Sequence, residues 1–413
     1  MSAPKLARII PILPLGRTSG RTKGATQFRH PLPLSLYVHI PWCVQKCPYC
    51  DFNSHQVRGG IPEDEYLAAL IADLESALPL IWGRKVSSIF FGGGTPSLLS
   101  GAALDTLLTA IRTRLPVLPG VEITLEANPG TVEAEKFAAF REAGINRLSL
   151  GIQSFNPDHL KALGRVHDDI EARRAIGIAA SLFENFNLDL MYGLPGQTHE
   201  QALSDLECAL TFAPTHVSCY QLTLEPNTAF AAAPPVLPDQ DCCADMQEAI
   251  EARLACAGYT HYETSAFAQP GRECQHNLNY WTFGDYLGIG AGAHGKLTCH
   301  DGVAWQVRRQ MRWKQPGQYL TQVAQRKPIQ EDFCVDTEDL PFEFMMNALR
   351  LNQGFEAALF EQRTALPLSG IENELRRAEC EGLIERLGSR IVPTLRGQRF
   401  LNRLLEMFLV ERG

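Results

Sequence analysis

The sequence predicts an α/β protein in which an open, partial barrel of six β–α units is followed by a small helix-rich domain. Apolar, strand-like runs alternate with helical patterns from about residue 36 to residue 222, and this alternation is typical of a parallel sheet with outer helices. The strands are continuous apolar runs, as expected when both faces of a sheet are covered. Polar residues and glycines gather after the strand ends, which favours a barrel over a doubly wound sheet, because barrels place their sites on that rim.

Each expected strand is short and is followed by a loop and a helix. The strands are expected at Leu36–Ile40, Ser87–Phe91, Glu122–Glu126, Arg147–Gln153, Asn185–Met191 and Val217–Leu222. The helices are expected at 63–80, 101–115, 132–143, 168–181, 198–212 and 240–257. Pro62 suits the first turn of the first helix, and Gly144 suits the end of the third, where a left-handed residue commonly terminates a helix.

The chain divides into four expected segments. They are a basic leader over 1–33, the barrel over 34–260, an aromatic and glycine-rich segment over 261–329 that packs on the barrel, and a C-terminal domain over 330–413. The last domain combines amphipathic helices with one β-hairpin, and a winged helix is its candidate type. Its helices are expected at Phe342–Leu351, Ile371–Glu381 and Leu401–Val410, and its hairpin at Leu383–Thr394.

The leader is frequent in Pro, Gly, Ser and Thr and contains no acidic residue. We expect it to be disordered, because such a composition buries little apolar surface. An organelle transit peptide is the alternative, since those segments are Arg-rich and acid-poor, although the prolines weaken an amphipathic helix. The basic residues are Lys5, Arg8, Arg17, Arg21, Lys23 and Arg29.

Composition excludes several classes of protein. The formal net charge of −8 argues against nucleic acid as the main partner. No apolar run is long enough to span a bilayer, and no secretory signal is recognisable. The twelve cysteines are scattered through a large chain, so reduced thiols in the cytoplasm are expected rather than disulfides.

Three cysteines follow the first expected strand in the stretch YVHIPWCVQKCPYCDFNSH. Cys43, Cys47 and Cys50 have C-x3-C-x2-C spacing. Thiolates are soft ligands that suit iron–sulfur clusters or zinc. Three thiolates on one loop, with no fourth nearby, indicate a cluster with one open coordination site. The alternatives are a zinc ion with a distant fourth ligand and unrelated core cysteines.

This loop resembles the radical S-adenosylmethionine (radical SAM) superfamily, and the resemblance implies a [4Fe–4S] cluster with S-adenosylmethionine on the fourth iron. The turn Gly92-Gly93-Gly94-Thr95-Pro96 resembles the superfamily's GGE-like motif, which implies cofactor contacts at Gly93, Gly94 and Thr95. A tight turn usually needs only one glycine, whereas several let backbone groups approach a ligand. This turn, with Glu126, argues against a barrel that is merely stabilised by zinc.

The stretches LEANPG, RLSLGIQSF and NLDLMYGLPGQT resemble the oxygen-independent coproporphyrinogen III oxidase family. By resemblance, Asp189 accepts both ribose hydroxyls of S-adenosylmethionine and Arg165 pairs with its carboxylate. The same likeness extends to the C-terminal, HemN-like domain. It implies further contacts, beside the cofactor or the cluster, at Tyr37, Tyr49, Glu126 and Gln153.

A glycine-rich stretch, Gly290-Ala-Gly292-Ala-His294-Gly295, fits G-x-G-x-x-G. A dinucleotide site needs that motif between a strand and a helix of a βαβ unit, and here an extended segment follows. We therefore expect a turn beside the cofactor. His294 is either a neighbour of the site or a structural histidine.

The motif His276-Asn-Leu-Asn-Tyr280-Trp281 follows Cys274. One interpretation is a buried aromatic corner. The other is a porphyrin site with an imidazole (His276) or a thiolate (Cys274) as axial ligand and stacking rings at Tyr280 and Trp281. The pattern H-N-x-x-Y-W is similar to that of the HemW haem chaperone family, which the chain resembles from about residue 33 to its end. Phe52 stands where the oxidases have a fourth cysteine, as it does in that family.

The hypothesis from the sequence is a cytoplasmic haem chaperone with three cofactors: a [4Fe–4S] cluster, S-adenosylmethionine and haem. Haem would pass to an acceptor protein, either an apo-haemoprotein or a respiratory complex, and a homodimer is left open. The rival is a radical SAM oxidoreductase that acts on a tetrapyrrole. Phe52 argues against the known oxidase reaction but not against another radical reaction.

Overall fold

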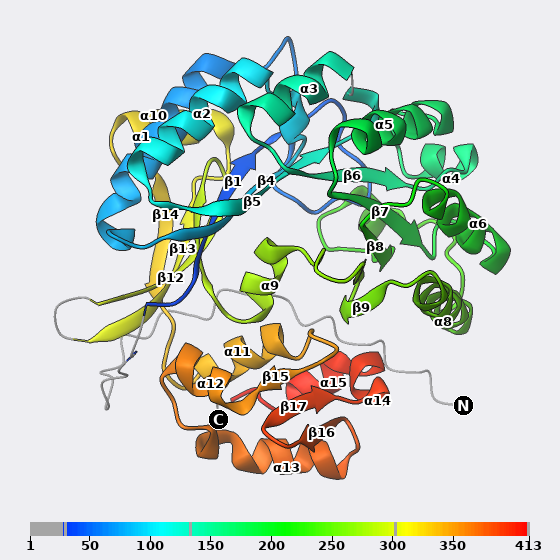
Figure 1. The fold of residues 1–413 in the computed structure, drawn as a ribbon, viewed down its shortest axis with the longest axis vertical. Helices are drawn as coiled ribbons and strands as arrows, with labels where there is room; N and C mark the ends of the chain where they lie inside the picture. Colours follow the sequence, from blue (N-terminus) through cyan, green and yellow to red (C-terminus); the bar gives the residue numbers. More distant parts are fainter. Residues whose placement is uncertain (1–27, 29–30, 132–133, 301–303, 411–413) are drawn as a thin grey trace.

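The computed structural model describes residues 28, 31–131, 134–300 and 304–410. One large sheet curves under a layer of helices, and a smaller domain lies below it in Figure 1. The strand order in the large sheet is β14-β13-β12-β11-β1-β4-β5-β6-β7-β8-β10-β9. The expected leader falls almost wholly outside the described residues.

The six expected strands are consecutive neighbours in this sheet and pair in parallel. They are β1 (Leu34–Ile40), β4 (Val86–Gly93), β5 (Val117–Ala127), β6 (Arg147–Gln153), β7 (Phe186–Tyr192) and β8 (His216–Gln221). The helices between and after them are α1 (Glu63–Ile81), α2 (Gly101–Arg114), α3 (Ala134–Ala143), α5 (Asp169–Leu182), α6 (His199–Leu210) and α8 (Gln240–Cys256). Two short helices, η1 (Pro96–Leu98) and α4 (Pro157–Ala162), lie in the loops after β4 and β6. The predicted α/β open barrel is confirmed, although the expected start of the third helix at 132 lies outside the described residues.

The segment after residue 260 extends the sheet at both edges rather than only packing on it. Strand β11 pairs in parallel with β1, and the strands beyond it are antiparallel. The added strands are β9 (Thr260–Glu263), β10 (Ala266–Ala268), β11 (Asp285–Ile289), β12 (His294–His300), β13 (Trp305–Arg312) and β14 (Ile329–Cys334). The expected domain boundary at 330 therefore falls inside β14.

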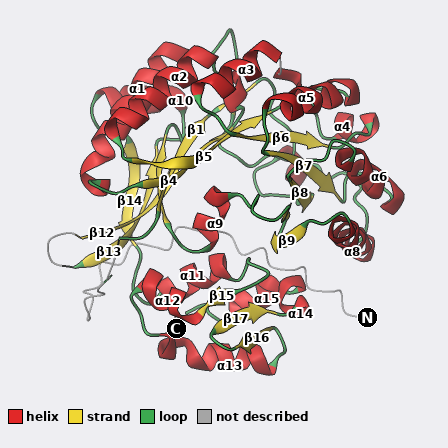
Figure 2. Cartoon of the chain, viewed as in Figure 1, coloured by secondary structure: helices red, strands yellow, loops and turns green. Residues whose placement is uncertain are grey.

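Side chains on the parallel strands alternate between an apolar outer face and a polar inner face. On β1, Leu36 and Val38 belong to the main core, which also includes Leu70 of α1. Their neighbours Ser35 and Tyr37 point the other way, into the barrel. The short helix α9 (Gln275–Trp281) lies on this inner side, opposite the outer helices (Figure 2). Its position makes the inner face an enclosed, polar environment.

The C-terminal domain has its own core around Phe344 and Phe360. Its helices surround a three-stranded sheet of order β15-β17-β16. They are α11 (Leu340–Ala348), α12 (Ala357–Thr364), α13 (Glu372–Cys380), α14 (Leu395–Arg399) and α15 (Leu401–Glu406), and the strands are β15 (Phe355–Glu356), β16 (Ile384–Leu387) and β17 (Arg390–Pro393). The winged-helix type of this domain stays a prediction.

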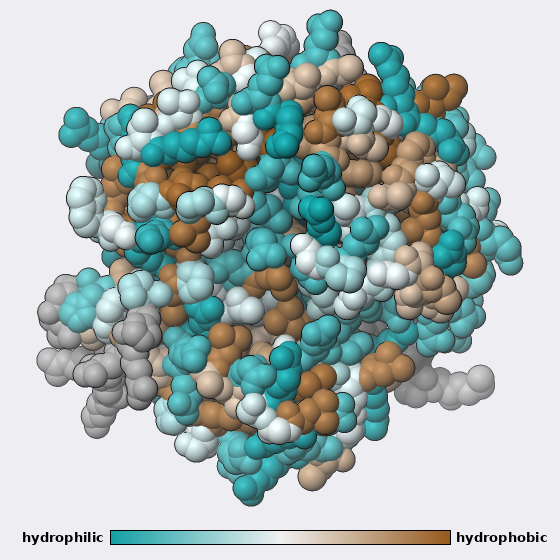
Figure 3. All heavy atoms as spheres, viewed as in Figure 1, coloured by the Kyte–Doolittle hydropathy of each residue, from teal (hydrophilic) through white to brown (hydrophobic). Residues whose placement is uncertain are grey.

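The surface of the molecule is mixed in character. Hydrophilic side chains cover most of the face seen in Figure 3, and hydrophobic ones form small groups among them. Within the described residues, every helix is too short or too polar to cross a membrane.

A buried ion pair ties the added strands to the barrel. Arg312 on β13 and Asp73 on α1 are both inaccessible to solvent and lie 3.2 Å apart. Asp73 also accepts hydrogen bonds from the Tyr319 hydroxyl at 2.9 Å and the Gly290 amide at 3.2 Å. A buried carboxylate satisfied by several donors holds α1, β13, α10 (Pro316–Ala324) and the turn after β11 together.

The substitution Arg312→Met tests this link. It leaves the Asp73 carboxylate buried with one partner fewer, so the free energy of unfolding should fall by about 3–5 kcal/mol in chemical denaturation. The control Arg114→Met breaks the exposed pair with Glu75 and should cost less than about 1 kcal/mol. Equal losses in the two variants would contradict a structural role for the buried pair.

Candidate functional site

The three cysteines lie on the loop that leaves β1, around the short strands β2 (Trp42–Cys43) and β3 (His55–Gln56). Cys43, Cys47 and Cys50 are free thiols of intermediate exposure. Burial raises the pKa of Cys43 and Cys50. Among the described residues, no three histidine, cysteine or carboxylate side chains are gathered tightly enough for a single metal ion. The loop offers three soft ligands, which suits a cluster that bonds each thiolate to a different iron.

The glycine-rich turn after β11 packs against the cysteine loop. Asn53 donates from Nδ2 to the carbonyls of Ala291 at 3.0 Å and Lys314 at 2.9 Å. Gly292 has a φ of +81°, and a Cβ there would lie 2.1 Å from the side-chain Nδ2 of Asn53. The G-x-G-x-x-G match therefore reflects close packing against this loop. An antiparallel strand, β12, follows it instead of a helix.

The Gly-Gly-Gly-Thr-Pro turn at the end of β4 packs equally closely. A Cβ at Gly93 would lie 2.5 Å from the ring of His39, and one at Gly94 would lie 2.5 Å from the carbonyl oxygen of Trp42. The Thr95 amide donates to that carbonyl at 2.7 Å. The glycines let the backbone reach the rim of the barrel beside the cysteine loop.

Two half-buried carboxyl groups face the inner rim beside this turn. Glu126 on β5 accepts a hydrogen bond from the Gly93 amide at 3.2 Å. Burial, followed by the nearby charge of Asp189, raises the pKa of Glu126 to about 8. Burial also raises the pKa of Asp189, against hydrogen bonds from Asn187 and Ser149. Such a pair is suited to accept hydrogen bonds from hydroxyl and ammonium groups of a ligand.

Arg165 joins the rim to the cysteine loop. Its Nη2 donates to Asn128 Oδ1 at 2.5 Å and to the Gly151 carbonyl at 2.6 Å, and its Nη1 lies 3.8 Å from Cys47 Sγ. Asn128 in turn donates to Thr95 Oγ1 at 2.9 Å. A half-buried guanidinium fixed from two sides is well placed for a carboxylate ligand. Sequence reasoning missed Asn128, which appeared only as part of an Asn-Pro-Gly turn.

Gln153 and the two tyrosines also lie on the rim. Gln153 has a φ of +69° and accepts a hydrogen bond from the Tyr220 hydroxyl at 2.6 Å. Tyr220 was not predicted from the sequence. Tyr49 packs beside Phe230 at a ring distance of 6.4 Å. Tyr37 contacts His39 through its hydroxyl at 3.0 Å and turns its ring toward the barrel interior.

His276 lies inside the barrel rather than on the rim. Its ring stacks on Phe90 at 4.9 Å and lies 6.3 Å from the ring of Tyr37, so Tyr37 connects the rim to α9. Nδ1 lies 3.0 Å from Ser88 Oγ, and Nε2 has no hydrogen-bond partner among the described residues. Burial, with a smaller effect of Arg147, lowers the pKa of His276 to about 3. The imidazole is therefore neutral.

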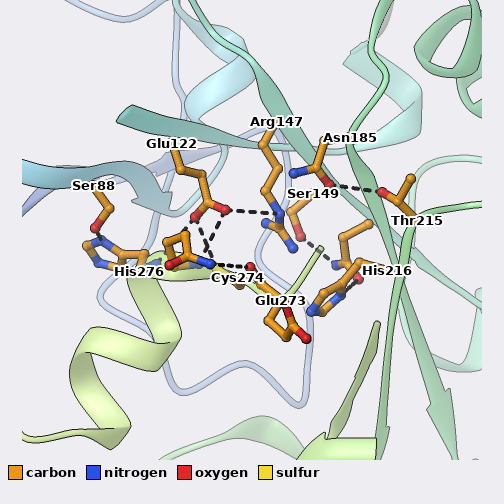
Figure 4. Close-up of polar contacts among 12 residues, drawn as sticks. Ser88, Glu122, Arg147, Ser149, Asn185, Thr215, His216, Glu273, Cys274 and His276 are labelled. Atoms are coloured by element: carbon orange, nitrogen blue, oxygen red, sulfur yellow. Dashed lines mark hydrogen bonds and ion pairs between the residues drawn. The ribbon is translucent and has the colours of Figure 1, made fainter. Parts of the chain in front are cut away.

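Glu122 fixes the start of α9, as Figure 4 shows. Its carboxylate accepts from Cys274 Sγ at 3.5 Å, from the Gln275 amide at 3.2 Å and from the His276 amide at 3.3 Å. Sequence reasoning placed Glu122 at the start of a strand and gave it no role. The structure shows that it holds the His276 motif against β5.

The remaining predicted residues lie in different parts of the structure. Tyr280 lies against His276 at a ring distance of 4.9 Å. Trp281 instead stacks under the guanidinium of Arg350, 4.6 Å away, toward the C-terminal domain. His294 is exposed at the start of β12. The structure thus brings His276 and Tyr280 together but places Trp281 and His294 apart from them.

Comparison with known proteins identifies close relatives. Residues 37–209 match the family model of the radical SAM superfamily, and residues 335–400 match the HemN C-terminal domain. The heme chaperone HemW of Escherichia coli K12 is 50% identical over 92% of this chain and 99% of its own. The heme chaperone HemW of Bacillus subtilis 168 is 35% identical over 91% of this chain and 99% of its own. The structure of coproporphyrinogen III oxidase (HemN) from Escherichia coli superposes with a TM-score of 0.77 at 26% identity, covering 92% of this chain and 90% of that one.

The raised pKa of Glu126 predicts a pH-dependent stability. The folded chain holds its proton up to about pH 8, whereas the unfolded chain releases it near pH 4.5. Stability should therefore fall as pH rises from about 4.5 to about 8, because the folded state binds more protons in that window. Glu126→Gln should flatten this slope in denaturation curves measured from pH 5 to pH 8. The control Glu75→Gln, exposed on α1, should keep it, and a slope unchanged in Glu126→Gln would contradict the assignment.

Proposed function

The chain belongs to the HemW family of haem chaperones, in the HemN-like branch of the radical SAM superfamily, and on this basis we propose that it binds haem and transfers it to an acceptor protein. The observation that carries the proposal is the state of His276. Ser88 donates its hydroxyl hydrogen to Ser35 Oγ at 2.7 Å, so it accepts from His276 Nδ1. This leaves Nε2 as a bare lone pair on a neutral imidazole, the form that ligates haem iron.

The aromatic surroundings of His276 support the same ligand. Phe90, Tyr37 and Tyr280 lie around the imidazole, and such faces suit a flat, apolar ring system. His276 is only 1% exposed. Haem therefore reaches Nε2 only when α9 shifts on the inner face of the barrel, which is a requirement of the proposal.

We propose that Cys43, Cys47 and Cys50 hold a [4Fe–4S] cluster, with S-adenosylmethionine at its open iron. When bound, the pair supplies one-electron chemistry. The chain contributes the surrounding groups. Arg165 would hold the carboxylate of the cofactor, and Asp189 its ribose. Further contacts on the same rim are expected by resemblance. The residues are Tyr37, Tyr49, Gly93, Gly94, Thr95, Glu126 and Gln153.

Phe52 separates a chaperone from an oxidase. Its side chain is 61% exposed on the cysteine loop, where a fourth thiol is expected in the oxidases. The retained rim residues and the likeness to coproporphyrinogen III oxidase keep a radical SAM oxidoreductase as the second candidate. We propose the chaperone because the HNLNYW motif and the closer relatives both favour it.

The acceptor is proposed by class only. An apo-haemoprotein or a haem-containing respiratory complex fits a donor of haem, and a homodimer fits the exposed apolar side chains of the cysteine loop, Val44 and Phe52. A cytoplasmic location is proposed from the free thiols, none of which is paired among the described residues.

Turnover distinguishes the two candidates. The chain, reconstituted anaerobically with iron and sulfide, should bind haemin stoichiometrically and should not convert coproporphyrinogen III when a reductant and S-adenosylmethionine are supplied. Absorption spectroscopy measures the first property and chromatography of porphyrins the second. Repeated turnover to protoporphyrinogen would show an oxidase instead.

Substitution of His276 tests the ligand. His276→Ala should shift the haem absorption maximum and lower haem affinity about tenfold or more, because the neutral imidazole is removed. The control His159→Ala removes another buried histidine, on α4, far along the chain from the motif, and should leave the haem spectrum unchanged. If His276→Ala keeps the wild-type spectrum, His276 is not the ligand, and Cys274 and Tyr280 become the next candidates.

A further inference from the structure

Arg147 is a buried arginine that forms no hydrogen bond to any residue that the structure describes. It lies on β6, points into the barrel and is 2% exposed. The nearest carboxylate oxygen belongs to Glu122 and lies 3.9 Å from Nε, beyond hydrogen-bond distance. Nε is unpartnered among the described residues. A guanidinium carries five N–H donors, so an unpartnered Nε in the interior is unfavourable unless a ligand uses it.

The polar groups around Arg147 form their hydrogen bonds to other residues. Both carboxylate oxygens of Glu122 accept at the start of α9. The Tyr262 hydroxyl lies 2.9 Å from His216 Nε2 and accepts from the Cys274 amide. Asp189 accepts from Ser149 at 3.2 Å and from Asn187 at 2.7 Å. Among the described residues, Arg147 therefore forms no hydrogen bond and keeps a long ion pair with Glu122, which Figure 4 draws.

Two further unpartnered atoms lie on the inner side of the barrel. They are Thr124 Oγ1 and His276 Nε2. Thr124 is the register partner of Arg147 on the neighbouring strand and of Phe90 on the other side. His276 stacks on Phe90. An unpartnered hydroxyl on β5, an unpartnered guanidinium nitrogen on β6 and an unpartnered imidazole nitrogen on α9, which packs on β4, thus lie on the inner side of the barrel.

We propose that Arg147, with the Thr124 hydroxyl, binds a carboxylate of the tetrapyrrole while His276 Nε2 ligates its metal. The inference rests on the proposed function and names a subsite within it. A guanidinium pairs bidentately with a carboxylate, and a serine or threonine hydroxyl adds a third hydrogen bond. Haem carries two propionates on flexible arms, so one carboxylate can enter the interior beside the iron. The same ligand would satisfy all three unpartnered atoms.

Esterified haem tests the subsite without any substitution. The reconstituted chain is titrated with haemin and with haemin dimethyl ester, in the same detergent, and followed by absorption. Haemin should bind about ten- to a hundredfold more tightly, the value of a hydrogen bond to a charged group. Equal affinities would overturn the subsite and leave the chaperone standing. If neither ligand binds, the proposed function fails and the subsite fails with it.

Arg147→Gln assigns the preference to this side chain. It should bind both ligands alike, near the affinity of the wild type for the ester, while the His276-dependent absorption maximum persists. The control Arg376→Gln changes an exposed arginine on α13 and should keep the preference. A preference retained in Arg147→Gln would overturn the proposal, because the carboxylate would then bind elsewhere.

Circular dichroism and cluster loading check that Arg147→Gln folds. If it does not, Arg147→Lys decides the question, since it keeps the charge and loses the planar fork. Its preference for haemin over the ester should be reduced but measurable. A preference in Arg147→Lys equal to that of the wild type would count against bidentate binding and overturn the proposal.

Discussion

The position of α9 inside this protein depends on the hydrogen bonds that the Glu122 carboxylate accepts. It accepts three donors from Cys274, Gln275 and His276, and so fixes a short helix against the inner face of a parallel barrel. The helix has only seven residues, too few to be stable by itself. Its anchor therefore determines where the His276 ring lies. The same carboxylate lies 3.9 Å from Nε of Arg147, an ion pair without a hydrogen bond.

The rim and the helix belong to one hydrogen-bonded network. Asp189 accepts from Asn187, whose Oδ1 lies 2.7 Å from His216 Nδ1. His216 Nε2 lies 2.9 Å from the Tyr262 hydroxyl, which accepts from the Cys274 amide. Burial and the charge of Arg147 lower the pKa of His216 far below its ordinary value. This histidine stays neutral, so it donates at one nitrogen and accepts at the other.

A radical SAM barrel does not by itself determine the reaction, because one fold serves many functions. The chain keeps the glycine turn, the paired carboxyl groups and the fixed arginine of the rim. It differs from the oxidases at Phe52, which is exposed on the cysteine loop. It also carries an imidazole whose free nitrogen faces the barrel interior. Phe52 and the free imidazole nitrogen both favour a scaffold that carries a tetrapyrrole over one that converts it.

The sequence by itself determined the features that local pattern encodes. The spacing of Cys43, Cys47 and Cys50 predicted a metal-binding loop, and alternating apolar runs located the six parallel strands. The position of Glu126 and Asp189 at strand ends placed both on one rim. The strand β11 was missed, because five residues that include a glycine give little periodic signal and its pairing with β1 joins residues about 250 positions apart.

Only the tertiary structure decided which polar side chains form hydrogen bonds with each other. Asn128 meets Arg165 across 37 positions, and Glu122 meets His276 across 154. Arg147 was expected only as the first residue of a strand, and nothing in its neighbourhood along the chain shows that it is buried without a hydrogen bond. The physical reason is that burial and hydrogen bonding in a barrel interior depend on strands and a helix brought together from distant parts of the chain.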